Sequence, residues 1–515
     1  MKKINIVLFI IILLLSACAF HTEAFAGDKT GIDSKEELNI KGRRVGVGEG
    51  SASMLIAERE LPNADIVYLD SVSGYEAVSQ GKLDAFVFER MQMQLAIDSG
   101  LKGVKLLDEN MDETIHIAYG ISPKCAIPDF EDRLNEFIAF IKGNGTFDDM
   151  VDRWIVNNSE DMPNIELPAN PEYHLVVGTT GVVPPYSYYR GSELSGFDIE
   201  AAYRFASWLD ADLEFKVYDY SGIIPAAAVG DVDCIMANLN ITPERAEALI
   251  FSDSIFDQEV GILVRAADSR NEAPGFLHRL KAGFEKTFMR EDRWSLFAKG
   301  ILVTLLITVM SIVLGTVLGF ILLMLSREGG YVINRLIGFC SGLILGLPMV
   351  VLLMVLYYII FERIALSGII VSIIGFTLTF GFTVYGLLKL GVSAIDTGQY
   401  EAAYALGHSR TQTFFRVILP QALPLVMDSY KGEITGLIKA TAIVGYIAVQ
   451  DLTKVGDIIR SRTYEAFFPL IAISLIYFML EWMFRIAVNK LQKELDPREK
   501  TWKGLLRGVK INDQG

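Results

Sequence analysis

Long apolar stretches in the second half of the chain constrain its fold most. They run over Gly300–Leu325, Leu336–Phe361, Leu366–Leu388, Ile434–Val449 and Phe467–Phe484. The first three are long enough to cross a bilayer as helices, whereas the fourth is short and contains Lys439. We therefore expect an all-α membrane domain of five spans over residues 300–490, followed by a basic tail at 491–515.

The basic residues between these stretches indicate how the spans are oriented. If the N-terminal half is exported, the segments assigned to the cytoplasm hold Arg327, Arg335, Lys389, Arg410, Arg416, Lys431, Lys490, Lys493, Arg498, Lys500, Lys503, Arg507 and Lys510. The loops assigned to the outside hold only Arg363, Lys454, Arg460 and Arg462. Because basic residues favour the cytoplasmic side, we expect the N-terminus outside and the C-terminus inside.

The first 26 residues have the pattern of a secretory signal peptide. Lys2-Lys3 precede an apolar run from Ile4 to Leu15, and small residues follow. Leu15-Ser16-Ala17-Cys18 resembles the lipobox of bacterial lipoproteins, which implies that Cys18 is lipidated, while Ala24-Phe25-Ala26 would suit an ordinary signal peptidase. Cys18 is alternatively only a small residue near the end of the apolar run.

Residues 27–275 form an acidic region, with 44 Asp and Glu against 20 Lys and Arg. This charge argues against nucleic acid as a partner. Its two cysteines, Cys125 and Cys234, could form a disulfide or remain isolated buried thiols. The chain has no C-x-x-C spacing, no nucleophile elbow and no G-x-x-x-x-G-K-[ST] run, so we expect no metal site, no catalytic residues and no ATPase activity of its own.

The segment between the third and fourth apolar stretches carries the most specific pattern. It reads Glu401-Ala402-Ala403, three residues, Gly407, nine residues, Val417, one residue, then Leu419-Pro420. We expect a helix over Glu401–Leu406 that stops at Gly407 and a second helix over Thr411–Leu419 that Pro420 ends. A solvated helical connection between two spans is the alternative, but it would not require this spacing.

This spacing resembles the EAA loop of bacterial ABC-importer permeases, and residues 294–495 resemble the polar amino-acid branch of that family. The resemblance implies that a separate ABC ATPase subunit, which would use ATP, docks on this loop. The docking residues would be Glu401, Ala402, Ala403, Gly407, Val417, Leu419 and Pro420. It also implies a homodimer, because one copy of five spans is half of what such importers need.

Two departures from that family concern the membrane path. Leu345-Gly346-Leu347-Pro348 stands where an Arg-Gly-Thr-Pro turn is usual, and Ile438-Lys439-Ala440-Thr441 stands where Leu-Lys-Asp-Thr is usual. A less polar path follows from the loss of an Arg and an Asp. Lys439 either lines this path or extends its charge towards the membrane surface.

Residues 171–268 alternate strand-like and helix-like segments, an α/β pattern. Leu175–Thr180, Pro184-Pro185-Tyr186, Tyr220–Pro225 and Thr242-Pro243-Glu244-Arg245 follow one another in an order that resembles the first lobe of family 3 solute-binding proteins, which bind polar amino acids. The resemblance implies that Arg245 grips the ligand's α-carboxylate through two parallel hydrogen bonds, which lysine cannot form. Tyr186 and Tyr220 would sandwich the ligand side chain, with core packing as the alternative. Asn238 and Asn240 replace the family's usual Gly and Thr.

Residues 35–154 resemble the second lobe together with the end of such a receptor. Ser51 and Ala52 match the helix start that contacts the ligand carboxylate, where free N–H groups favour an anion. Glu89 stands at the end of a strand where the family usually has an Asp that holds the α-ammonium group. The longer side chain implies a different pocket geometry.

The second lobe thus precedes the first. We expect lobe 2 with the receptor's C-terminal part at 35–157, a linker at 158–171, lobe 1 at 172–268 and a juxtamembrane segment at 273–299. One circularly permuted receptor explains this order, and two decayed tandem receptors, each lacking a lobe, are the alternative. The fold class is therefore a two-lobed α/β receptor of the periplasmic-binding-protein type followed by an all-α permease.

These features predict the receptor–permease subunit of an ABC importer for polar amino acids, located in the bacterial cell membrane with the receptor outside. A ligand-gated channel is a rival prediction, but it calls for a re-entrant pore loop and no coupling loop. An amino-acid sensor would need a signalling domain after the last span, and residues 490–515 are too few for one. The spacing from Glu401 to Pro420 favours the importer.

Overall fold

The computed structural model describes residues 31–48, 51–159, 161–266, 281–361, 364, 366–464 and 467–495. The expected signal peptide, Cys18 and most of the basic tail lie outside these residues. The chain divides into two compact units. The first comprises the residues up to Ile117, Phe256–Arg279 and Tyr464–Ala466, and the second comprises the remainder.

The first unit contains a sheet with the strand order β2-β1-β3-β14-β4, and β5 also pairs with β14. Its strands are β1 (Arg44–Gly48), β2 (Asp65–Leu69), β3 (Ala85–Glu89), β4 (Val104–Leu106), β5 (Thr114–Ile117) and β14 (Phe256–Arg265). Its helices are α2 (Ala52–Glu60), α3 (Ser71–Ser79) and α4 (Arg90–Asp98). Fully buried Val45, Val47, Val87 and Ile262 form its core, because central strands covered on both faces read as continuous apolar runs. We refer to this α/β domain as lobe 2.

Strand β14 differs from the expected boundary, which assigned residues 172–268 to lobe 1. It runs antiparallel to β3, with Val260 opposite Glu89 and Val264 opposite Ala85, and it also pairs with β4 and β5. The physical reason is the apolar run from Val260 to Val264, which fills the centre of the lobe 2 sheet. The chain therefore leaves lobe 2 after β5 and returns to it at β14.

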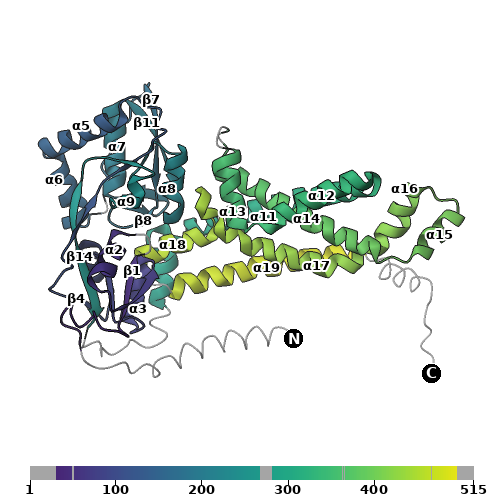
Figure 1. Ribbon diagram of the computed structural model, residues 1–515, viewed down its shortest axis with the longest axis horizontal. Helices are drawn as coiled ribbons and strands as arrows, with labels where there is room; N and C mark the ends of the chain where they lie inside the picture. Colours follow the sequence, from purple (N-terminus) through teal and green to yellow (C-terminus); the bar gives the residue numbers. More distant parts are fainter. Residues whose placement is uncertain are drawn as a thin grey trace. The chain divides into compact units, whose positions relative to one another are not determined.

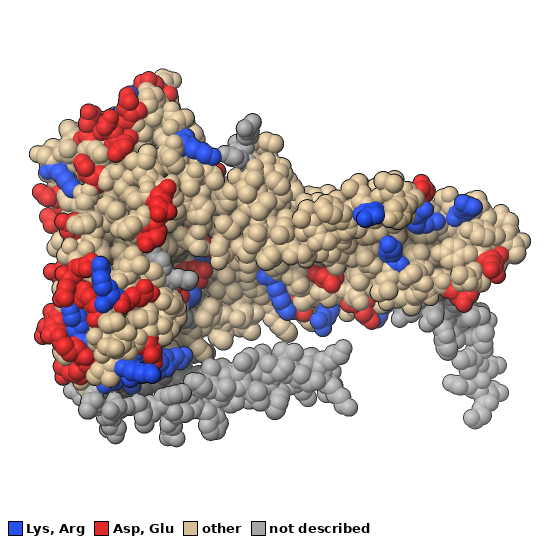
Figure 2. All heavy atoms as spheres, in the orientation of Figure 1, with Lys and Arg blue, Asp and Glu red and all other residues tan. Residues whose placement is uncertain are grey.

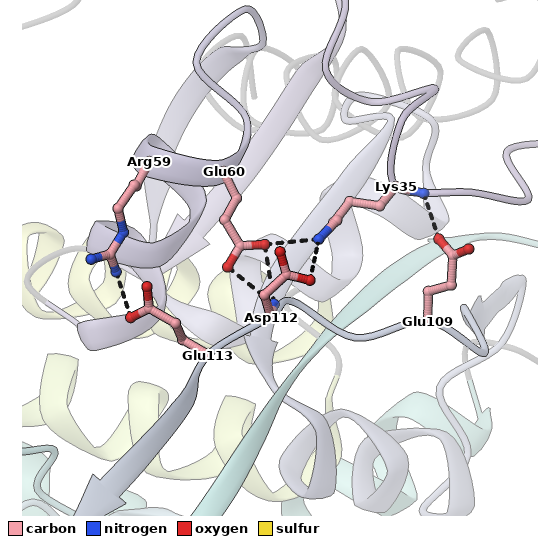
Figure 3. A network of polar contacts seen from close by, with 6 residues as sticks. All are labelled: Lys35, Arg59, Glu60, Glu109, Asp112 and Glu113. Carbon is pink, nitrogen blue, oxygen red and sulfur yellow. Dashed lines mark hydrogen bonds and ion pairs between the residues drawn. The ribbon is translucent and has the colours of Figure 1, made fainter.

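An ionic network attaches the start of lobe 2 to its own body (Figure 3). The Lys35 ammonium lies 3.0 Å from Glu60 Oε2 and 2.7 Å from Asp112 Oδ1. The backbone N–H of Lys35 donates to Glu109 Oε2 at 2.9 Å. Burial alone would lower the pKa of Lys35, but its hydrogen bonds to Asp112 and Glu60 outweigh that effect and raise the pKa above 10.5.

The second unit begins with an α/β domain built on a sheet of order β11-β7-β12-β6-β13. Its strands are β6 (Gly120–Ile121), β7 (Tyr173–Thr179), β11 (Ala211–Val217), β12 (Cys234–Ile235) and β13 (Ile250–Phe251), with β8 (Val182–Val183), β9 (Ser187–Arg190) and β10 (Glu193–Ser195) in a small antiparallel sheet. Its helical elements are α5 (Phe130–Gly143), α6 (Thr146–Val151), η1 (Asp152–Val156), α7 (Phe197–Leu209), α8 (Tyr220–Val229) and α9 (Pro243–Ala246). We refer to this domain as lobe 1. It includes residues from before the linker, since β6 pairs with both β12 and β13.

The remainder of the second unit is helical and forms the permease region. Its elements are η2 (Glu285–Met289), η3 (Arg290–Asp292), α11 (Trp294–Glu328), α12 (Gly330–Gly346), α13 (Met349–Val355), η4 (Leu356–Ile360), α14 (Gly368–Ser393), α15 (Thr397–Ala405), α16 (Arg410–Thr413), η5 (Phe414–Ile418), α17 (Leu419–Ala440), η6 (Thr441–Ile447), α18 (Leu452–Thr463) and α19 (Phe467–Leu495). Among the described residues, three helices are long and apolar enough to cross a membrane, or up to five if each of two bent pairs is one span. The fold class expected from the sequence, α/β lobes followed by an all-α membrane region, is confirmed.

The two bent pairs occur where single apolar stretches were expected. Helices α12 and α13 meet at 107°, because Pro348 disfavours helical geometry at the residue before it, and Leu347 is accordingly extended with ψ 138°. The fourth stretch is not one span from Ile434 to Val449: α17 starts earlier, and the chain bends by 60° before α18. Ala448, at φ 57°, terminates the first member of that pair.

Helices α11 and α14 lie side by side (Figure 1), and glycines occur where they approach each other most closely. A Cβ added to Gly319 would lie 2.8 Å from the carbonyl oxygen of Gly381, and one added to Gly381 would lie 2.6 Å from Leu318 Cδ2. Such close backbone approach is typical of helices that associate in lipid. The opposite side of α11 exposes Leu302, Val313 and Val317.

On the face shown in Figure 2, Asp and Glu gather over the α/β lobes, whereas the long helices carry few charges.

Candidate ligand-binding and coupling sites

Arg245 in lobe 1 lies close to two of the other expected ligand residues. The guanidinium is buried, with 5% of the residue exposed, and Nη2 donates to the Tyr220 hydroxyl at 2.9 Å. Its Nη1 donates to the carbonyl oxygen of Asn240 at 2.9 Å. Thr242 caps the short helix α9 by accepting from the backbone N–H of Arg245, so the Thr-Pro turn positions the arginine locally. The structure therefore brings Arg245, Tyr220 and Asn240 together.

Asn238 is held by its backbone in the left-handed region, at φ 50°. Its N–H donates to Asp198 Oδ2 at 2.7 Å, and the Tyr119 hydroxyl lies 3.4 Å from Oδ1 of the same carboxyl group. Burial raises the pKa of Asp198 to about 7, although these two hydrogen bonds lower it in part. Asp198, which the sequence interpretation did not single out, thus fixes the turn that carries Asn238.

Tyr186 lies in the interior of lobe 1. It is fully buried, and its ring meets the ring of Phe197 edge-on with centroids 6.4 Å apart. Its place beside the ligand side chain stays a prediction, with core packing as the alternative. Thr180, directly after β7, has a buried hydroxyl without a hydrogen-bond partner among the described residues. Such an unsatisfied group marks a candidate position that the sequence alone did not reveal.

The expected residues of lobe 2 belong to the first unit. Ser51 caps α2 by accepting from the N–H of Met54 at 3.2 Å, and its own hydroxyl donates to Gly48 O at 2.7 Å. Ala52 is the first residue of the helix and is nearly buried. Ser53 follows with a fully buried hydroxyl that has no partner in the described part of the chain. The Ser51 hydroxyl, by contrast, is already engaged in the helix cap.

Glu89 ends β3 and is 1% exposed. Its carboxylate accepts a hydrogen bond from Gln92 Nε2 at 2.9 Å, three residues later in α4. A buried carboxylate needs such partners, since burying an unpaired charge is costly. The strand end therefore holds a fixed acceptor suited to an ammonium group.

The expected coupling loop forms two helices at the tip of the permease region (Figure 1). Helix α15 ends at Ala405, and Gly407 adopts φ +82° in a left-handed turn, as a C-terminal glycine stop requires. Ser409 and Gln412 form a reciprocal capping box at the start of α16. The chain thus turns sharply between two defined helices.

Pro420 does not end the second helix, which corrects the sequence expectation. The chain passes from α16 through the π-helical turn η5 directly into α17, so that Pro420 falls in the first turn of α17. Proline is tolerated in a first helical turn, and here the preceding π-helical turn already departs from the α-helical hydrogen-bond pattern. Consequently the loop is connected to α17 without a break.

The side chains of the coupling loop differ in exposure. Glu401, Ala402 and Gly407 are exposed, Ala403 is buried, and Val417, Leu419 and Pro420 are half-buried. Two larger side chains that the pattern did not single out, Tyr404 and Leu406, are 46% and 80% exposed. An exposed apolar helix end of this kind is typical of an interaction surface.

Two further sequence questions concern single residues. Lys439 lies in the last turn of α17 on its exposed side. Cys125 and Cys234 are both free in this structure. Burial raises the pKa of Cys125 to about 12, which leaves its thiol protonated and unreactive at neutral pH.

Comparison with known proteins explains why these two sites occur on one chain. Residues 315–498 match the family "Binding-protein-dependent transport system inner membrane component", and residues 175–300 match "Bacterial extracellular solute-binding proteins, family 3". The "Putative glutamine transport system permease protein GlnP" of Rickettsia typhi is 30% identical over 201 residues, which are 38% of this chain and 91% of that protein. The chain belongs to the inner-membrane-component family.

Other relatives of this transport permease are similar over the same region. The "L-cystine transport system permease protein TcyL" of Bacillus subtilis is 29% identical over 32% of this chain and 73% of its own length. The structure titled "Crystal structure of an amino acid ABC transporter with histidines" is 25% identical, with a TM-score of 0.37 over 43% of this chain and all of that chain. The two family matches and the GlnP relative show that the protein is an inner-membrane transport permease that carries a solute-binding domain. The GlnP and TcyL relatives are transport permeases.

Proposed function

We propose that this chain is the receptor–permease subunit of an ABC importer for polar amino acids. It captures the amino acid outside the membrane and passes it inward, while a separate ATPase subunit hydrolyses ATP. One observation carries the proposal: a chain of the permease family also holds a buried arginine, Arg245, fixed by Tyr220 and Asn240 in a solute-binding lobe. The relatives named for glutamine and cystine support the substrate class.

The lobe 1 site suits the carboxylate that every amino acid carries. A guanidinium forms two parallel hydrogen bonds with a carboxylate, and within lobe 1 Arg245 donates to the Tyr220 hydroxyl and to the Asn240 carbonyl oxygen. The Arg245 guanidinium carbon lies 5.5 Å from the centroid of the Tyr220 ring. The ring of Tyr220 therefore makes a cation–π contact with the guanidinium group. In the first unit, taken by itself, Glu89 is the proposed acceptor for an ammonium group, and Ser51, Ala52 and Ser53 form the proposed helix start.

The coupling loop suits an ATPase partner. Leu406 and Tyr404 expose apolar surface beside Glu401, and the loop continues into α17 without interruption. Movement imposed on α15 is therefore transferred to a long helix of the permease. The chain itself contains no G-x-x-x-x-G-K-[ST] sequence for nucleotide phosphates, which assigns ATP hydrolysis to the partner.

The permease acts as a homodimer, and its receptor is one circularly permuted domain. Two strands support the permutation: β6 completes the lobe 1 sheet from upstream, and β14 completes the lobe 2 sheet from downstream. Two decayed receptors would each lack such strands. Lipidation of Cys18 would attach lobe 2 to the membrane surface, and replacing Cys18 by Ala tests that part through uptake.

The proposal is tested on the full chain with the twenty amino acids, each added separately. Thermal stabilisation of the solubilised protein reports binding, because a ligand that binds only the folded state raises its stability. At least one polar amino acid should stabilise the wild type, and Arg245→Ala should abolish that effect. Arg190→Ala, which removes an arginine of lobe 1 whose side chain is 45% exposed, is the matched control. Unchanged affinity in Arg245→Ala would refute the assigned pocket.

A further inference from the structure

A five-residue segment of lobe 1, Tyr218–Gly222, is attached to the permease helices. We refer to it as the docking segment. The Lys454 ammonium donates to the Tyr218 carbonyl oxygen at 2.9 Å and to Asp219 Oδ1 at 2.7 Å. The backbone N–H of Asp219 donates to the carbonyl oxygen of Gly445 at 3.1 Å. Tyr220, a proposed ligand contact, lies at the centre of this segment.

The far end of the docking segment is held by a tyrosine. The Tyr358 hydroxyl lies 3.2 Å from the Gly222 carbonyl oxygen and 2.8 Å from that of Tyr446. It therefore joins lobe 1 and the permease at one atom. A Cβ added to Gly222 would lie 2.7 Å from the Tyr446 carbonyl oxygen, so the two backbones are in direct contact here.

Gly445 shows the same close approach on the permease side. A Cβ at this position would lie 2.2 Å from Asp219 Oδ2, a separation that side-chain atoms do not tolerate. A larger residue at Gly445 in η6 would therefore require the Asp219 carboxylate to move. The contact is thus shaped on both sides, by Gly222 in lobe 1 and by Gly445 in the permease.

The buried ammonium group of Lys454 is hydrogen-bonded to residues of lobe 1. The residue is 4% exposed, and both described acceptors of its ammonium group belong to the docking segment. Its backbone N–H is bonded to Asp451 Oδ1 at 3.0 Å, in the first turn of α18. Because a buried ammonium group needs its partners, a displacement of Asp219 displaces Lys454 and with it the start of α18.

Further contacts extend the attachment beyond the docking segment. The Tyr357 hydroxyl donates to Asp231 Oδ2 at 2.8 Å, and the same carboxylate accepts from the Tyr218 hydroxyl. The Arg462 guanidinium stands over the Tyr188 ring, 4.5 Å from its centroid. Lobe 1 is therefore built onto the permease rather than connected to it only through the chain.

We propose that the Asp219–Lys454 ion pair is a coupling contact, which reports occupancy of the Arg245 site to α18 of the permease. The inference rests on the proposed function. A carboxylate bound by the other N–H groups of Arg245 would lie next to the Tyr220 hydroxyl, which accepts from Nη2, and Tyr220 is the first residue of α8, directly after Asp219. Neither Asp219 nor Lys454 touches the ligand in this scheme, so both are positioning residues.

The test uses the full chain with its ATPase subunit in lipid vesicles. An equimolar mixture of the twenty amino acids serves as the probe. Two quantities are measured: the mixture concentration that gives half-maximal thermal stabilisation, and the ratio of ATPase rates with and without the mixture. Lys454→Met should leave the first quantity at the wild-type value and lower stimulation about tenfold, as expected when a coupling contact is lost.

Two further variants make the test decisive. Tyr358→Phe removes only a hydroxyl group. It should also lower stimulation of the ATPase rate without changing the half-maximal concentration of the mixture. If Lys454→Met does not fold, the result for Tyr358→Phe alone tests the proposal. Lys105→Met is the matched control, since it removes an ion pair of the same 2.7 Å length, with Asp33, within the first unit. It should behave like the wild type.

The possible failures can be told apart. Wild-type stimulation in folded Lys454→Met or Tyr358→Phe overturns the coupling contact and leaves the proposed function intact. A loss of stimulation that follows a loss of affinity also overturns it, because the pair would then only build the ligand site. If the wild type shows neither stabilisation nor stimulation, the proposed function fails and this inference fails with it.

Discussion

The Trp154 indole donates a hydrogen bond to the buried carboxylate of Glu200 at 2.6 Å. Arg153 and Arg204 also bind this carboxylate, at 2.7 Å each. Trp154 lies in η1, upstream of the linker, and Glu200 lies in α7, downstream of it. One side chain thus joins the two parts of lobe 1 that the linker separates in sequence.

Glu200→Gln should destabilise lobe 1. Glu200 is fully buried, and its charge compensates two guanidinium groups that are only partly exposed. Breaking a buried pair of this kind costs about 3 kcal/mol, which corresponds to a fall of roughly 6–12 °C in the unfolding temperature of a domain of this size. Thermal unfolding of the full chain, followed by intrinsic fluorescence, measures it. The exposed Glu193 provides the control Glu193→Gln, and equal midpoints for both variants would contradict the role of the carboxylate.

The pH dependence of lobe 1 should carry the signature of Asp198. Because its folded-state pKa is about 7, well above the ordinary 3.8, the folded state binds more protons than the unfolded state between these values. The contribution of Asp198 to the free energy of unfolding is therefore largest below pH 4. It declines as pH rises to about 7, by about 1.4 kcal/mol per pH unit at most. Asn can still accept from the Asn238 N–H, so Asp198→Asn should remove this decline.

Unfolding temperatures of the wild type and Asp198→Asn, measured from pH 5 to pH 8, check this prediction. The unfolding temperature of the variant, relative to that of the wild type, should increase as pH rises and become constant above pH 7. A constant difference across this range would mean that Asp198 titrates at its ordinary pKa in the folded protein.

The sequence predicts features that depend on neighbouring residues. The stop at Gly407 follows from the preference of glycine for positive φ, and the structure shows it. Pro420 was interpreted by the same local rule and wrongly, because the π-helical turn η5 moves the proline into the first turn of α17. A rule based on the proline and its neighbours does not predict that the preceding turn is π-helical.

Features that depend on distant residues were not predictable in this way. The pairing of β14 with β3 joins residues far apart in the chain, and its apolar run would suit the centre of either sheet. Likewise, Lys454 is one of the charges that the sequence assigns to an outer loop, and its distance from Asp219, 235 residues, hides their pairing. The backbone turn at Arg245 follows from neighbouring residues, since Thr242 caps the helix that carries it, while the role of Arg245 in ligand binding stays a prediction.

The packing of α11 on α14 should be sensitive to a single methyl group. In Gly319→Ala the new Cβ would lie 2.8 Å from Gly381 O and from Val384 Cβ, so the helices must separate. Overpacking of this kind costs about 1–3 kcal/mol, and the variant should unfold at a lower temperature in lipid nanodiscs. Gly338→Ala on α12 is the control, because a Cβ there meets nothing within 4 Å. A wild-type midpoint for Gly319→Ala would show that α11 and α14 are less closely packed.

The exposed end of the coupling loop should determine binding of the ATPase subunit. Leu406 is 80% exposed at the end of α15, and an apolar side chain that fills a pocket on a partner contributes about 2 kcal/mol or more. Leu406→Asp should therefore reduce copurification of the ATPase subunit about thirtyfold at limiting concentration. Amino-acid binding to the receptor should persist, since lobe 1 is left unchanged.

Ile40→Asp is the matched control for that experiment. Ile40 is also an exposed apolar residue, at 54%, but it belongs to the first unit. It should retain the ATPase subunit, which separates a specific contact at α15 from a general effect of removing exposed apolar surface. Full retention by Leu406→Asp would place the ATPase contact elsewhere, and the exposed residues Glu401 and Ala402 of the same helix would be the next to substitute.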